Sequence, residues 1–76
     1  MKRIEFRIFV PDQRAKDRIS SRLAGYGDIH TTTKPTFMVY GEGPKIWLMK
    51  RLAEIAKKEG DAIKIEWREH DRQRKG

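Results

Sequence analysis

The 76-residue chain contains no cysteine and no asparagine, and it has no apolar run long enough to cross a bilayer. Without cysteine it can form neither a disulfide nor a thiolate metal site, which fits a reducing compartment. The first residues, "MKRIEFRIFVPD", alternate charged with apolar side chains and therefore lack the unbroken apolar core of a signal peptide. We therefore expect a cytoplasmic protein that does not enter membranes.

Negative charge is also scarce. Eleven Asp and Glu face eighteen Lys and Arg, so the net charge is +7. A small domain this basic is attracted to polyanions at long range, above all to nucleic acids. A basic surface that only maintains solubility, or one that contacts a protein partner, is the alternative that charge leaves open.

Apolar periodicity predicts one domain over residues 1–69 and a basic, frayed tail over 70–76. Strict alternation predicts strands, and spacing of three or four predicts helices. The expected strands cover residues 3–10, 36–40 and 61–69, with a weaker edge strand and turn over 28–36, and the expected helices begin at Asp12 and at Lys45. This β-α-β-β-α-β order predicts an α+β, ferredoxin-like two-layer sandwich. Its antiparallel sheet would have the order 4-1-3-2, with both helices on one face.

Two details of packing follow from the same pattern. The helix over 45–59 carries an apolar stripe of Leu48, Met49, Leu52, Ala53, Ile55 and Ala56. In the third strand two parities are open. If Phe37 and Val39 point inward, Met38 and Tyr40 face out, whereas the opposite parity exposes Phe37 in place of Tyr40.

The stretch "GEGPKIW" over 41–47 resembles a phosphate loop only superficially. It lacks the longer glycine run that ends in Gly-Lys-Ser/Thr, and Glu42 would repel a phosphate. Glycines with free φ, followed by Pro44 at the first helical position, suit a strand-to-helix turn. We interpret the stretch as a turn.

Two cationic surfaces are candidates for binding nucleic acid. The first choice is the open face of the sheet, where aromatic rings beside Arg and Lys would form a platform that stacks single-stranded bases. The residues predicted for this face are Arg3, Arg7, Phe9, Tyr40, Lys64 and Arg68.

The second choice is the surface of the helices. Three arginines follow one another at four-residue steps in the first helix, a spacing that suits a row of phosphates. In the second helix, a helical wheel places Trp47 opposite the apolar stripe, where an exposed indole can stack on a base or fill a partner's pocket. The full predicted set is Arg14, Arg18, Arg22, Lys45, Trp47, Lys50 and Arg51.

Catalytic and metal-binding patterns are weak. The two histidines, His30 and His70, are not at ligand spacing from each other, and we predict no metal and no cofactor. A small ribonuclease with His30 as general base is the catalytic alternative. The residues favour a non-catalytic module that binds single-stranded RNA or DNA. The competing hypothesis is a protein-binding regulator or inhibitor that uses an exposed aromatic and basic patch, including as a homodimer.

Overall fold

Strand β1 (Lys2–Phe9) carries the alternation that organises the sheet. Ile4, Phe6 and Ile8 are buried on one side, and Glu5 and Arg7 between them are exposed on the other. The computed structural model describes residues 2–71, with side chains as far as Glu69. One face of β1 therefore lies in the core and one faces solvent.

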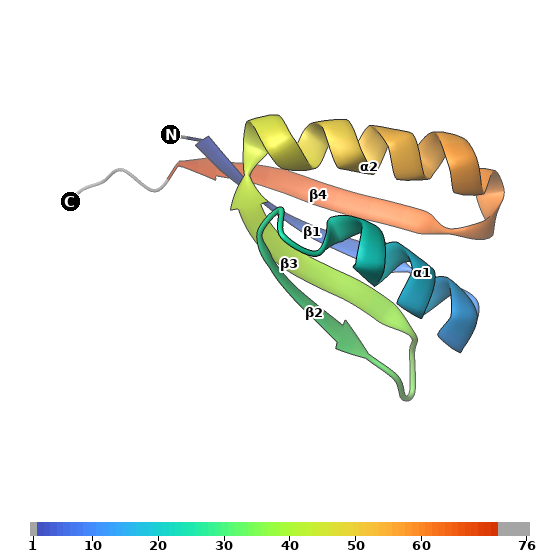
Figure 1. The fold of residues 1–76 in the computed structure, drawn as a ribbon. Coiled ribbons are helices and arrows are strands. Elements are labelled where there is room, and N and C mark those ends of the chain that lie inside the picture. Colours follow the sequence, from blue (N-terminus) through green and yellow to red (C-terminus); the bar gives the residue numbers. More distant parts are fainter. Residues whose placement is uncertain (1, 72–76) are drawn as a thin grey trace.

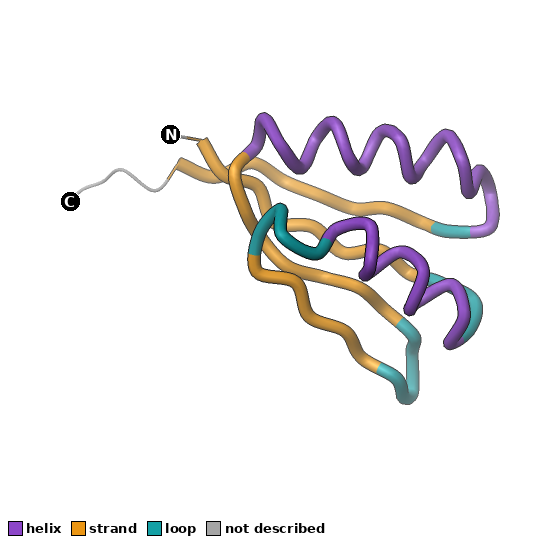
Figure 2. The backbone as a smooth tube through the Cα atoms, in the orientation of Figure 1, coloured by secondary structure: helices purple, strands orange, loops and turns teal. Residues whose placement is uncertain are grey.

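The other elements follow in the predicted order (Figure 1). They are α1 (Gln13–Leu23), β2 (Asp28–Thr32), β3 (Met38–Pro44), α2 (Lys45–Glu59), a 3-10 turn (Gly60–Ala62) and β4 (Lys64–Asp71). Neighbouring strands are antiparallel in the order β2-β3-β1-β4, which from the other edge is β4-β1-β3-β2. Both helices cover the same face of this four-stranded sheet (Figure 2). No helix within residues 2–71 is both long and apolar enough to cross a membrane.

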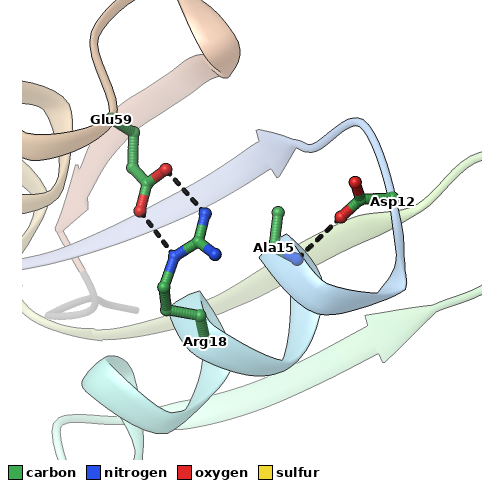
Figure 3. Close-up of polar contacts among 4 residues, drawn as sticks. All are labelled: Asp12, Ala15, Arg18 and Glu59. Atoms are coloured by element: carbon green, nitrogen blue, oxygen red, sulfur yellow. Dashed lines mark hydrogen bonds and ion pairs between the residues drawn. The ribbon is translucent and has the colours of Figure 1, made fainter.

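Helix α1 begins where the sequence predicts. The Asp12 side chain accepts a hydrogen bond from the Ala15 backbone N–H at 2.9 Å, which confirms the predicted N-cap (Figure 3). The helix ends at Leu23, and Gly25 follows with φ of 90°. Tyr26 continues the apolar spacing of α1 in the sequence but lies outside the helix, and it packs against the core.

The register of β3 places Phe37 and Val39 on the core side and Met38 and Tyr40 on the open face, which is the first of the two predicted arrangements. Val39 is fully buried opposite Ile8, and Phe37 packs against the core. Tyr40 lies opposite Arg7 and faces outward with it. The ring predicted for the open face is therefore on that face.

The interpretation of Gly41–Pro44 as a turn is wrong, because these residues continue β3 and pair with β1. The glycines at 41 and 43 do not have positive φ, so backbone freedom is not what requires them. A Cβ at Gly41 would collide with the Asp28 carbonyl oxygen, and one at Gly43 would lie 2.7 Å from the Tyr26 carbonyl oxygen. The strands approach too closely for any side chain here. Pro44 is the N-cap of α2 rather than its first helical residue.

Three other expectations also need correction. Ala53 and Ala56, predicted for the core, are exposed, since α2 buries Leu48, Leu52 and Ile55 instead. Alternation with Lys64, Glu66 and Arg68 predicts that Trp67 faces the core. Trp67 lies on the helix side of β4 but is 46% exposed, because α2 contacts β1 and β3 and leaves the edge strand partly uncovered. Strand β4 continues to Asp71, two residues into the predicted tail. The rest of that tail, 72–76, lies outside the described residues.

Candidate nucleic-acid interface

The open face of the sheet, the first-choice surface, is balanced in charge. The strand register places four cations and four carboxylates on it, namely Arg3, Arg7, Lys64 and Arg68 with Glu5, Asp28, Glu42 and Glu66. Each cation has a carboxylate partner at 3.4 to 3.8 Å, in the pairs Arg3–Glu42, Arg7–Glu66, Lys64–Glu66 and Arg68–Glu5. Glu5 and Glu66 thus lie in ion pairs that cross between β1 and β4. The cations already have partners.

The cations of the open face offset the repulsion within a row of acidic side chains. Asp28 lies directly opposite Glu42, and Glu42 lies directly opposite Glu5. Like charges in directly opposed positions destabilise a sheet. Arg3 pairs with Glu42 and Arg68 pairs with Glu5, so both offset this repulsion. Their role is structural before any ligand is considered.

Aromatic rings are nevertheless present on the open face. Phe9 and Tyr40 lie there as predicted, and the His30 ring lies 5.4 Å from the Tyr40 ring, tilted by 30°. An open hollow of about 650 Å³ lies over these strands, and carboxylates of all four strands line it with Arg7, His30 and Tyr40. The face offers rings without a surplus of positive charge. Within residues 2–69, no three acidic or histidine side chains are grouped as metal ligands.

The surplus of positive charge lies on the helices. Apart from the buried Lys16, which bonds to a threonine, the described helical cations without a carboxylate at ion-pair distance are Arg14, Arg22, Lys50, Lys57 and Lys58. Helices α1 and α2 lie side by side over the sheet (Figure 1). The unpaired cations therefore belong to the layer opposite the open face.

The predicted row of arginines on α1 is interrupted. Arg18 donates two hydrogen bonds to the Glu59 carboxylate of α2, at 2.9 and 2.8 Å, and so links the two helices (Figure 3). These bonds are the main reason why the pKa of Glu59 lies below its ordinary value, and the nearby charges of Arg22 and Lys58 lower this pKa further. Three cations thus surround one ionised carboxylate, which leaves a local excess of positive charge.

The indole of Trp47 is 58% exposed, as the helical wheel predicts. Its ring centre lies 6.5 Å from that of Tyr26, tilted by 46°. The Arg51 guanidinium sits 4.6 Å from the centre of the Tyr26 ring and donates to the Tyr26 hydroxyl at 2.7 Å. Tyr26 is therefore held by a cation–π contact and a hydrogen bond, and it supports one side of the indole. Sequence reasoning missed this role, because Tyr26 fits the apolar spacing of α1.

Lys45, also predicted for this surface, has a different role. Its ammonium group lies 2.9 Å from the Glu69 carboxylate, which also pairs with Lys2 at 3.2 Å. Hydrogen bonds from Lys45 and Lys2 lower the pKa of Glu69. The lysine at the start of α2 is therefore tied to β4, on the flank of the helix away from Tyr26.

Side chains of α1, of α2 and of the turn after α1 form one surface along the line where the two helices meet. We call it the interhelical surface and define it by Arg18, Arg22, Tyr26, Trp47, Arg51 and Lys58. Comparison with family models, curated proteins and solved structures gave no match. Charge and side-chain geometry alone therefore indicate the function.

The link between the helices makes stability depend on pH. Because the folded-state pKa of Glu59 is lowered, its ionised form contributes stability above the unfolded-state pKa, and this contribution disappears as pH falls through the folded pKa. We expect Glu59→Gln to lower the free energy of unfolding at neutral pH and to match the wild type in acid. Urea unfolding across this range measures the difference. Asp61→Asn is the control, since Asp61 has no ion pair with a described residue, and an equal deficit at every pH would contradict the prediction.

Proposed function

We propose that the protein is a small, non-catalytic module that binds single-stranded nucleic acid on its interhelical surface. One observation carries the proposal. The unpaired cations lie in the same layer as a half-exposed indole, whereas every sheet-face cation faces a carboxylate. Single-strand binders combine these two elements, because charge attracts the phosphates and an aromatic ring stacks a base.

The two ends of the interhelical surface suit different parts of a nucleotide. Near Glu59, Arg22 and Lys58 have no ion pair of their own within the described chain, so they are available to phosphate oxygens. Near the start of α2, Trp47 presents its indole to solvent, and one side of the ring contacts Tyr26, which Arg51 holds in place. A single strand that follows α2 would meet charge at one end and a stacking ring at the other.

The open sheet face, with Arg3, Arg7, Phe9, Tyr40, Lys64 and Arg68, remains the competing surface. A phosphate that binds there must draw an arginine from its carboxylate, which would leave the acidic row of the sheet less well compensated. The order of the six main elements also supports a ferredoxin-like fold, and we include that family of architectures in the proposal.

Salt dependence tests the proposal. If about four phosphates are neutralised, log affinity for a single strand should fall against log salt with a slope of roughly −3. Arg22→Gln combined with Lys58→Gln should make the slope shallower by about 1.4 and weaken binding of all sequences. Fluorescence anisotropy of a labelled oligonucleotide at several salt concentrations measures both quantities.

The matched control removes two cations from the other face, as Arg7→Gln combined with Lys64→Gln. We expect this variant to keep the wild-type slope, because both side chains are paired with Glu66. A shallower slope in the control alone would assign the phosphates to the sheet. No binding of wild type at low salt would reject nucleic acid and favour the protein-partner hypothesis.

A further inference from the structure

Strand β4 forms one edge of the sheet, so its outer backbone groups have no strand partner within the described chain. Unpaired edges are templates for pairing with another strand. The helix side of this edge is apolar and incompletely covered, with Trp67 46% exposed and Ile63 and Ile65 partly buried. On the adjacent flank of α2, Ile46 is 78% exposed.

We propose that two copies of the chain associate through β4. The two strands pair antiparallel about a two-fold axis at Ile65 and join two four-stranded sheets into one. A symmetric dimer must use one patch that is complementary to itself. The charges and apolar residues of β4 make the strand complementary to itself in one pairing register.

Charge on the open face excludes most registers. A two-fold at Lys64, Glu66 or Arg68 places that residue opposite its own copy. Like charges in directly opposed positions are unfavourable. A two-fold at Ile65 places Lys64 opposite Glu66 of the partner subunit, and this pairing occurs twice by symmetry. A two-fold at Trp67 also gives an opposite-charge pair, between Glu66 and Arg68 of the partner subunit.

The side chains on the helix side of β4 distinguish the two-fold at Ile65 from the two-fold at Trp67. With the two-fold at Trp67, Ile65 would face Glu69 of the partner subunit, an apolar side chain against a carboxylate. With the two-fold at Ile65, the isoleucine meets its own copy and Trp67 faces Ile63 of the partner subunit. Pairs of an aromatic with a β-branched residue stabilise antiparallel strands. Ile63 has extended backbone angles, with φ of −131° and ψ of 166°, so it can continue the ladder.

This surface does not overlap the interhelical surface, so the inference does not depend on nucleic-acid binding. It does use Lys64 and Glu66, whose side chains are 72% and 41% exposed, and whose replacement therefore leaves the core unchanged. Lys64→Glu creates a glutamate opposite Glu66 of the partner subunit, and Glu66→Lys creates a lysine opposite Lys64 of the partner subunit. Each change replaces two attractive contacts with two repulsive ones.

Analytical ultracentrifugation of the full chain over a dilution series tests the proposal. We expect the wild type to sediment as a species whose mass is about twice the 9.0 kDa of one chain. Each single variant should raise the dimer dissociation constant roughly tenfold or more. An equimolar mixture of the two variants should restore the dimer, because the glutamate introduced in one chain would then face the lysine introduced in the other. This recovery also shows that both variants are folded.

Three outcomes would overturn the proposal. A wild type that stays monomeric at every concentration excludes the dimer. A dimer unaffected by either variant places the contact at another surface, such as the β2 edge. A dimer weakened by Glu66→Lys but not by Lys64→Glu indicates the register centred on Trp67, in which Glu66 faces Arg68 of the partner subunit.

Discussion

Truncation of Trp47 to alanine should weaken single-strand binding by roughly 1–3 kcal/mol, about five- to 150-fold at constant salt. The indole is 58% exposed, and its ring contact is with Tyr26, so its loss removes a stacking surface without opening the core. Unfolding should therefore change little. Anisotropy titrations with a labelled single strand, beside urea unfolding of the same variant, measure the two effects separately.

Two variants serve as controls for this result. Trp47→Phe keeps a ring at the position and should recover most of the affinity. Phe9→Ala removes a ring from the open sheet face, where Phe9 lies opposite Met38 and Lys64, and it should leave binding largely unchanged. If Phe9→Ala instead causes the larger loss and Trp47→Ala has no effect, then the bases stack on the sheet and the interhelical assignment is wrong.

Local periodicity was enough to predict most of the fold. In β1 the apolar residues occupy every second position, so a single register satisfies the core, and the structure buries those residues. Helix α2 covers 45–59 as predicted, because Pro44 and Gly60 mark its ends in the sequence. The exposed position of Trp47 follows from the same local geometry, since a helical wheel needs only the residues of one helix.

The glycines of β3 show what periodicity cannot supply. Alternation is visible only where side chains differ in polarity, and a glycine has none to show which face it occupies. Gly41 and Gly43 were therefore interpreted as a turn, although they lie on the core-facing side, opposite Phe6 and Ile4. Glycine is required at these two positions because β2 and the turn before it approach β3 closely. The residues that approach are more than a dozen positions away in the sequence, so local periodicity does not reveal them.

The ion pair between the two helices was equally hidden from the sequence. Arg18 and Glu59 are 41 residues apart, and only the packing of α1 beside α2 brings them into hydrogen-bond contact. Net charge predicted a basic protein, but the strand register decides which cations face carboxylates. For that reason the sheet was the first choice in sequence, while the structure places the unpaired charge on the helices.

Replacement of Gly41 by alanine should cost roughly 3 kcal/mol or more of unfolding free energy. The new Cβ would collide with the Asp28 carbonyl oxygen, a backbone atom that cannot rotate away, so β2 and β3 would have to separate. Inserting atoms into a well-packed interior typically costs 1–3 kcal/mol, and a rigid neighbour raises that cost. A 76-residue domain has a total stability of roughly 4–11 kcal/mol, so a large part of it would be lost. Urea unfolding followed by circular dichroism measures the change.

Gly27 and Gly25 provide the matched comparisons, because the chemical change is the same at each. A Cβ at Gly27 would collide with the Glu42 carbonyl oxygen of β3, so Gly27→Ala should be comparably severe. At Gly25 a Cβ meets nothing within 4 Å, and only its φ of 90° opposes alanine. That strain should cost roughly 1–2 kcal/mol. If Gly41→Ala proves no more destabilising than Gly25→Ala, the close approach of β2 and β3 is not what requires glycine at this position.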